Sequence, residues 1–336
     1  MPDKHTRRSF VKGSLAAAAG ASLAMSLEEE ALLTGLATAA EKDAAADKPP
    51  EPVKPGSKGT LPTGKLGKLS VSRVVLGGNL IGGWAHSRDL TYVSSLLRHY
   101  FSQEKILQTL RIAEEWGVNC VNTHPNAGEL IQRYRKERGG KILWIAQGFP
   151  DDDGKFTGIQ RSIDQGADSV YIQGNVGDRF AAAKKFDVLA KAMAYIKKQG
   201  LPAGIGGHAL ETVQTCEKAG VGADYYVKTL HTLDYFSARR PDQGPDVLAS
   251  RHDNFWCSDP KATIDFMETV NRPWFAFKVM AAGAIPPRKA FEHAFRNGAD
   301  FILAGMFDFQ IGKDAQIAKQ VLAKVTKGKR SRPWRA

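Results

Sequence analysis

The chain has 336 residues and a formal net charge of +12, with 24% charged and 43% hydrophobic residues. This length is sufficient for one large domain with a well-buried core. Most of the charge lies at the two ends: residues 1–12 carry a net +3 and residues 324–336 a net +6. Basic stretches with interleaved aromatic residues are absent from the interior. The composition therefore argues against nucleic-acid binding, and we expect a basic, solvated tail over 328–336.

The N-terminal residues have the pattern of an export signal. Arg7 and Arg8 precede the apolar, alanine-rich stretch 15–25. Paired arginines before a mildly hydrophobic segment are typical of a twin-arginine signal, whose partner is the twin-arginine export machinery. We predict a signal peptide over 1–40, a flexible linker over 41–64, and a periplasmic or secreted protein. The apolar stretch is too short for a stable span, so no membrane anchor is expected.

Apolar runs recur along the rest of the chain, and each ends at a polar side chain. The runs lie at 74–78, 119–121, 142–146, 169–172, 203–207, 225–227, 274–277 and 301–305. Helical patterns separate most of them, starting near Ser102 and then at about 181–199, 209–219, 260–270, 286–297 and 311–326; short helices are expected after the second and third runs. This alternation predicts a (β/α)₈ TIM barrel over 65–327.

Active sites of such barrels lie at the C-terminal ends of the strands. The polar residues that follow the apolar runs are therefore the candidates for chemistry. They are Asn79, Asn122, His124, Gln147, Gln173, His208, Lys228, His231, Lys278 and Asp308. The three cysteines, Cys120, Cys216 and Cys257, have no metal-type spacing, and we expect free thiols.

Two long connections leave strand C-termini, at 79–101 and 229–258. Both mix aromatic residues, such as Trp84, with Asp, Asn and His. Aromatic rings stack on the C–H faces of sugars while polar side chains bond hydroxyl groups, so this mixture suits a polyhydroxylated small molecule. A packed lid would explain the aromatic residues as well.

His124, His208 and His231 follow three of the strands. If their rings converge, they can bind a divalent metal, with Asp308 or Asp253 completing the set. Alternatively, one of them acts as a general base while the others orient substrate hydroxyls, or all three are ordinary hydrogen-bonded residues.

Lys278 follows four apolar or aromatic residues. A lysine in such surroundings can serve as a base, form a Schiff base, or bind a substrate anion. Lys228, at the end of the sixth strand, has the same alternatives. We assign His124, His208, His231 and Lys278 as catalytic candidates. The candidate substrate-binding residues are Asn79, Trp84, Asn122, Gln147, Gln173, Lys228 and Asp308.

The chain resembles the aldo/keto reductases over most of residues 65–325. The segments that carry the resemblance are 67–77, 113–119, 204–208, 276–283 and 298–305. Members of that family use an Asp and a Tyr after strand 2, a Lys ending strand 3 and a His ending strand 4. The matching positions here are Asn122, Ala127, Gln147 and Gln173, none of which titrates near neutral pH. The family also holds the NADP phosphate with basic residues after strand 8, where this chain has Asp308, so the sequence argues against NADP.

These observations predict an exported barrel enzyme that acts on a sugar or related carbonyl compound by non-redox acid/base chemistry, as a lyase, epimerase or hydrolase. Two alternatives stay open. One is an NADP-dependent aldo/keto oxidoreductase, and the other is a non-catalytic ligand-binding protein on a reductase scaffold. The cofactor is not identified by the sequence.

Overall fold

The structure is a computed structural model that describes residues 52–88, 90–151, 154–238 and 256–336. The predicted signal peptide, and the linker up to residue 51, lie outside the described residues. The chain from Pro52 to Ala336 forms one compact unit.

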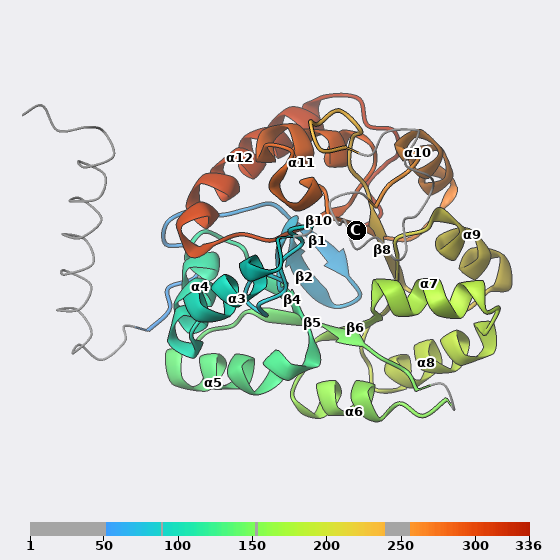
Figure 1. The fold of residues 1–336 in the computed structure, drawn as a ribbon, viewed down its shortest axis with the longest axis horizontal. Coiled ribbons are helices and arrows are strands. Elements are labelled where there is room, and N and C mark those ends of the chain that lie inside the picture. The colour runs from blue at the N-terminus through green and yellow to red at the C-terminus, as the bar shows by residue number, and fades with distance from the viewer. Residues whose placement is uncertain (1–51, 89, 152–153, 239–255) are drawn as a thin grey trace, which may run out of the picture. The chain divides into compact units, whose positions relative to one another are not determined.

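Eight parallel strands close into a barrel in the order β10-β3-β4-β5-β6-β7-β8-β9 (Figure 1). They are β3 Val74–Gly77, β4 Cys120–Thr123, β5 Leu143–Gly148, β6 Ser169–Ile172, β7 Ala203–Gly207, β8 Tyr225–Thr229, β9 Trp274–Phe277 and β10 Phe301–Ala304. The first and last strands pair directly, with Val75 opposite Leu303. The predicted (β/α)₈ fold is confirmed, and all eight strand C-termini lie at one end of the barrel.

Helices surround the strands (Figure 1). They are α3 Tyr92–Tyr100, α4 Gln103–Glu115, α5 Gly128–Arg138, α6 Thr157–Asp164, α7 Gly174–Ala182, α8 Phe186–Lys198, α9 Leu210–Ala219, α10 Pro260–Thr269, α11 Pro287–Arg296 and α12 Asp308–Lys327. The expected helix at 181–199 is instead α7 and α8, separated where Lys184 adopts a positive φ of 54°. The long connection at 79–101 contains α3, which the sequence did not predict. Across the described ranges, no helix has the length and apolar character to cross a membrane.

The linker prediction is wrong for the residues between 52 and 64. Val53 N donates to Arg138 O, and Gly56 N donates to Glu114 O, so this segment packs along the ends of α5 and α4. The chain then forms a hairpin of β1 Thr63–Leu66 and β2 Leu69–Ser72, turned at Gly67 with a φ of 58°. This hairpin leads into β3 and buries two of its side chains in the barrel interior.

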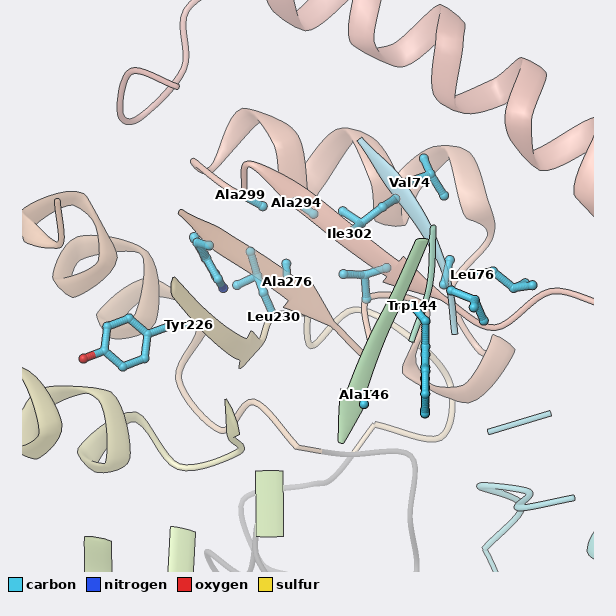
Figure 2. Packing of buried hydrophobic residues seen from close by; sticks show 14 of the residues in the cluster. Val74, Leu76, Trp144, Ala146, Tyr226, Leu230, Ala276, Ala294, Ala299 and Ile302 are labelled. Atoms are coloured by element: carbon cyan, nitrogen blue, oxygen red, sulfur yellow. The ribbon is translucent and has the colours of Figure 1, made fainter. Parts of the chain in front are cut away.

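The core has two layers because successive strand residues point to opposite faces. Val74 and Leu76 pack outward against the helices (Figure 2), whereas Val75 points into the barrel. The interior is filled by large side chains, among them Tyr171, Tyr225, Phe275 and Phe301. The barrel is thus a packed core whose free surface lies at the rim.

A repeated polar brace ties the starting ends of the strands together. A residue just before each of β4, β6, β8 and β10 accepts a hydrogen bond from a backbone N–H. The donor lies near the start of the preceding barrel strand, at 2.8–3.0 Å. The acceptors are Asn119, Asp168, Asp224 and Asp300, and the donors are Ser72, Trp144, Ala203 and Trp274. Two positions before each acceptor stands a glycine with φ between 78° and 98°: Gly117, Gly166, Gly222 and Gly298. Only glycine adopts this backbone cheaply, so the turn and the acceptor recur together.

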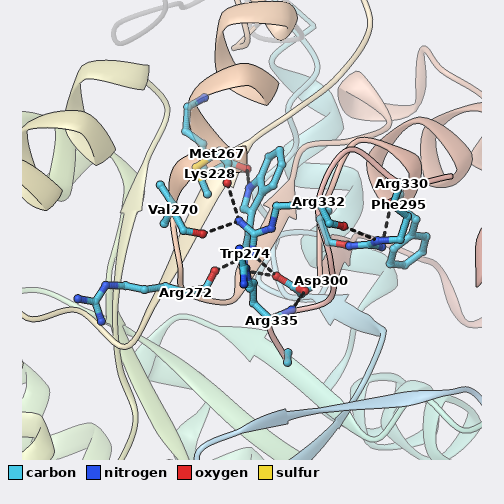
Figure 3. Close-up of polar contacts among 12 residues, drawn as sticks. Lys228, Met267, Val270, Arg272, Trp274, Phe295, Asp300, Arg330, Arg332 and Arg335 are labelled. Atoms are coloured by element: carbon cyan, nitrogen blue, oxygen red, sulfur yellow. Dashed lines mark hydrogen bonds and ion pairs between the residues drawn. The ribbon is translucent and has the colours of Figure 1, made fainter.

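The basic tail is not a solvated end, which corrects the expectation from the sequence. Arg332 is 3% exposed and pairs with the fully buried Asp300 at 2.8 Å (Figure 3). It also donates to the carbonyl oxygens of Met267, Val270 and Arg272, where α10 ends. The Trp334 ring lies 4.1 Å from the Arg73 guanidinium and 3.3 Å from that of Arg330, measured to the ring centroid. Arg330 and Arg332 therefore help to seal the lower end of the barrel, while Lys329 and Arg335 are exposed.

We predict that Arg332→Met lowers the free energy of unfolding by about 3–5 kcal/mol, because it leaves the Asp300 carboxylate buried without its cation. Urea denaturation measures this change. Arg288→Met is the matched control, since Arg288 lies on the surface and reaches Gln320; about 0.5 kcal/mol or less is expected there. Equal stability of the Arg332 variant and wild type would show that the tail does not close the barrel.

Candidate active site

The floor of the barrel mouth consists of amide side chains above a buried tyrosine. Asn122 Nδ2 donates to Ile145 O at 2.9 Å, and the Tyr171 hydroxyl donates to Asn122 Oδ1 at 3.3 Å. Gln147 interacts with the same hydroxyl. Burial raises the pKa of Tyr171 above its ordinary value, so this group stays protonated. The side chains of Asn122 and Gln147 thus form an uncharged polar floor.

An aspartate–histidine dyad stands at the end of β7. His208 Nδ1 lies 2.9 Å from Asp178 Oδ2, and both side chains are at least 95% buried. Asp178 also accepts from the backbone N–H groups of His208 and Ala209, and from Thr212 Oγ1 at 2.6 Å. With Nδ1 bound to the carboxylate, Nε2 carries the lone pair. Within the described part of the chain, Nε2 has no hydrogen-bond partner.

The electrostatic surroundings keep His208 neutral. Burial lowers its pKa to about 4; the Asp178 bond opposes this, while the charges of Lys278 and Lys228 add to it. A β-carbon on Gly174 would lie 2.8 Å from His208 Cε1, so the start of α7 can approach this ring only because that residue is glycine. The His208 ring centroid also lies 5.1 Å from that of Phe277.

Lys278 follows β9 in a strained conformation and holds a defined place at the mouth. Its φ is +58°, and Ala281 and Ala282 just after it also have positive φ. Such residues cost on the order of 1–3 kcal/mol each and cluster at functional sites. Lys278 Nζ lies 2.8 Å from His86 Nε2 and 3.7 Å from the centroid of the Trp256 ring.

His231 does not offer its ring to a ligand. Its Nε2 accepts from Trp256 N and Cys257 N, both at 3.0 Å, and its Nδ1 lies 2.9 Å from Thr232 O. Burial lowers its pKa to about 4, with smaller contributions from Lys228 and other cations. Nε2 fixes the segment that carries Trp256, and Nδ1 contacts the adjacent backbone at Thr232, so His231 is a positioning residue here.

Lys228 points away from the mouth. On β8 it has the same parity as Tyr226, which packs in the outer layer, whereas Val227 points inward. Its side chain is 1% exposed and donates to Thr229 Oγ1 at 2.7 Å and Thr229 O at 3.0 Å. Burial lowers its pKa. Lys228 is thus a buried cation behind the site, and a direct substrate contact is not supported.

His124 belongs to a different part of the rim. Its ring lies edge-on to Trp84 at 5.0 Å and against Phe149 at 5.0 Å. Its Nδ1 accepts from Asn126 N, which caps the short helix η1 Pro125–Ala127. The charges of Lys278 and Lys228 lower the pKa of both His208 and His231, whereas the charge of Arg161 lowers the pKa of His124. Its surroundings are therefore unlike those of the other two histidines.

A metal site finds no support in the part of the chain that the structure describes. No group of three or more His, Cys, Asp or Glu residues is arranged there to hold an ion. The three cysteines are buried and free, in β4, α9 and the segment before α10. Asp253 lies outside the described residues.

Two further candidates have structural partners. Gln173 Oε1 accepts from Val176 N and so caps α7. Asp308 begins α12 and accepts from the Tyr100 hydroxyl at 2.6 Å and from Lys105 Nζ at 3.1 Å. Burial opposes ionisation of Asp308, but these two partners lower its pKa overall. Asp308 therefore joins α12 to α3 and α4.

Three residues at the mouth were not singled out from the sequence: Asp178, His86 and Trp256. Asp178 lies within a helix and looks like a surface acid until α7 is placed against β7. His86 and Trp256 stand in the two long connections, which was the available signal. Asn79, a predicted substrate-binding residue, has its Nδ2 2.8 Å from His86 Nε2.

One open hollow lies elsewhere. It has a volume of about 640 Å³ and is lined by residues of α6 and α8, including Phe156, Arg161 and Tyr195. No predicted site residue lines it. The candidate reactive side chains therefore do not line this hollow. We place the candidate site at the barrel mouth, because the side chains with shifted pKa values and close partners lie there.

Known proteins resemble the chain in fold. No family model matches it, and no curated protein does. A Pseudomonas aeruginosa protein assigned to the aldo-keto reductases is 18% identical, covering 78% of this chain and 97% of its own, with a TM-score of 0.51. The phospho-2-dehydro-3-deoxyheptonate aldolase of Thermotoga maritima is 13% identical, covering 79% and 74%, with a TM-score of 0.48. The likeness is one of fold. The likeness to the Pseudomonas aeruginosa protein supports the TIM barrel and leaves function to the residues.

The two depressed histidine pKa values predict acid sensitivity. In the unfolded chain His208 and His231 protonate near pH 6.5, whereas in the folded protein they do so near 4. Their contribution to stability is therefore complete above about pH 6.5 and is lost as the pH falls towards 4, by on the order of 3 kcal/mol for each group.

Urea denaturation across this pH range measures the loss. His231→Gln should flatten the dependence, because an amide oxygen can accept one of the two backbone N–H groups without titrating. His99→Gln, on the exposed face of α3, serves as the control. A dependence that is identical in wild type and His231→Gln would contradict the assignment.

Proposed function

We propose that the protein is a non-redox enzyme that acts on a sugar or related carbonyl compound, with His208 as the base that removes a proton from the substrate. The single observation that carries this proposal is the buried dyad: Asp178 holds Nδ1 at 2.9 Å, and Nε2 is the lone-pair nitrogen at the rim. A base oriented by a carboxylate in this way is a recurring catalytic arrangement.

The low pKa of His208 limits the chemistry that it can perform. A weak base removes only a proton that is already acidified, such as one on the carbon beside a carbonyl group. The positive charge of Lys278 favours the oxyanion that forms when such a proton leaves. A negative charge developing on the substrate would also offset the cations that depress His208, so the base strengthens as the reaction proceeds.

The mouth suits a polyhydroxylated molecule. Asn122 and Gln147 supply uncharged polar groups, while Phe277 and the 45% exposed Trp84 supply apolar faces. Amides bond hydroxyl groups and rings stack on C–H faces. NADP-dependent reduction is less well supported, because Asn122 and Gln147 replace the reductase's acidic and basic residues and the Asp308 carboxylate stands in the first turn of α12.

Deuterium exchange tests the proposal across whole classes of compound. The protein is incubated in deuterium oxide with aldoses, ketoses and sugar acids, and each compound is followed by NMR. We expect exchange or turnover at a carbon beside a carbonyl group. His208→Gln should lower the rate by roughly a hundredfold or more.

His99→Gln is the matched control, because His99 lies on the exposed face of α3. Circular dichroism shows whether the His208 variant keeps its fold. The proposal fails if no class of compound exchanges, or if the folded His208→Gln variant exchanges at the wild-type rate.

We also propose that the protein is exported in folded form through the twin-arginine machinery. Arg7 and Arg8 before the apolar stretch 15–25 support this. Replacing both with Lys should leave the full-length precursor in the cytoplasm, as measured by fractionation. Replacing Lys4 with Arg is the control. Normal export of the double variant would contradict the proposal.

A further inference from the structure

Among the described residues, His86, Asn79 and Trp256 form a cage around the Lys278 amine at the rim. Its Nζ lies 2.8 Å from His86 Nε2, and Asn79 Nδ2 lies 2.8 Å from the same nitrogen. The face of Trp256 is 3.7 Å away on another side. No assignment above uses His86, so its place beside the strained lysine needs an explanation.

The hydrogen-bond donors fix where the protons lie. An amine is more basic than an imidazole by roughly four pH units in ordinary peptides, so the shared proton belongs to Lys278. His86 Nε2 is then the acceptor for both the ammonium and the Asn79 amide, and the ring carries its own proton on Nδ1. The Trp256 ring stabilises the ammonium further. Each of these contacts favours the charged lysine.

The cage is rigid because its walls are fixed by the backbone. His231 accepts the N–H groups of Trp256 and Cys257, which sets the height of the indole ring. The positive φ of Lys278 directs its side chain away from the path that a regular strand would give it. Ordering of this kind reduces the freedom that an acid would lose on meeting its substrate.

His208 and Lys278 both lie close to one aromatic ring, that of Phe277. The Phe277 centroid lies 5.1 Å from the His208 ring and 5.9 Å from Lys278 Nζ. His208 and His231 both sense the charge of Lys278. A neutral base and a charged acid thus lie 5.1 and 5.9 Å from the centroid of one aromatic ring, near enough to each other to act on one substrate.

We propose that Lys278 is the general acid of this site, that His86 positions it, and that the reaction is the elimination of water from a β-hydroxy carbonyl compound of the sugar or sugar-acid class. This inference rests on the proposed function, since it takes His208 as the base. It adds the second group, its positioning residue and the bond that breaks.

His208 Nε2 takes the proton from the carbon beside the carbonyl, and the C–H electron pair becomes the new carbon–carbon double bond. The C–O bond at the next carbon breaks with its electron pair on oxygen, and Lys278 gives that oxygen a proton, so that water leaves. His208 is left protonated and Lys278 neutral; one proton passes from one to the other through solvent, and no oxidant or reductant is needed.

The state of Lys278 can be measured without a substrate. Isotope-labelled reductive methylation gives its amine an NMR signal that titrates, assigned with Lys278→Met. We expect this signal to titrate at lower pH in His86→Leu, which lacks an acceptor, and close to wild type in His86→Gln, whose amide oxygen accepts. The control Lys261→Met removes an exposed lysine on α10. An unchanged titration in His86→Leu would overturn the role given to His86, whatever the enzyme's activity.

The reaction class is tested with the compounds that exchange deuterium. Products should have lost one water, Lys278→Met should lower kcat by roughly a hundredfold or more, and Lys261→Met should not. His86→Leu should lower kcat by about tenfold, as for a lost bond to a charged group, and shift the alkaline limb of the pH profile to lower pH. His86→Gln should restore both.

Different failures have different meanings. An isomer formed without loss of water would overturn elimination while leaving His208 as the base. If His208→Gln and Lys278→Met both keep the wild-type rate of deuterium exchange, both proposals are overturned.

Discussion

The structure depends on the polar brace at the starting ends of the barrel strands. In a parallel barrel every strand begins with backbone groups that have no helix or hairpin of their own to satisfy them, and burial without partners is costly. Here one carboxylate or amide before every second strand accepts the N–H beside its neighbour. Because the strands are fixed in pairs at this end, their relative heights are set at the other end as well. The positions of the rim residues are fixed in this way, so His208 after β7 and Lys278 after β9 can both be held close to the Phe277 ring.

The site shows how burial and charge divide roles among similar residues. Two histidines have the same depressed pKa, of about 4, for the same main reason, which is burial. They differ in what their nitrogens contact. His208 gives one nitrogen to Asp178 and keeps the other at the rim, whereas His231 uses both on the backbone. Two lysines differ in the same way, because Lys228 points behind the barrel wall and Lys278 is turned over the mouth. Contacts, more than residue type, decide which group can do chemistry.

The fold could be predicted because its signal is local. Apolar runs of strand length alternate with helical patterns, and the polar residue after each run fell at the rim, as for Asn122, Gln147 and His208. The alternation of inward and outward side chains along a strand is also local information. Applied to β8, it would have predicted that Lys228 points outward, as Tyr226 does. The contacts of Asp178 and His86 depend on how distant elements dock, which no spacing encodes. The tail was misjudged because six basic residues without acids look solvated. Two of them, Arg330 and Arg332, instead bind backbone carbonyls, and Arg332 also pairs with the buried Asp300, 32 residues earlier in the chain.

The sealed lower end also orders events during synthesis. Arg73, which immediately precedes β3, donates to Asp300 O and stacks with Trp334, so the first strand of the barrel is completed by residues that are translated only after the strands β3 to β9. Until those residues leave the ribosome, β3 lacks its neighbour β10 and presents an unpaired edge. Such edges recruit other strands, so the nascent chain needs protection until β10 has been made. A ribosome that stalls within the last strand and helix would release a chain with most of its core but no closed barrel.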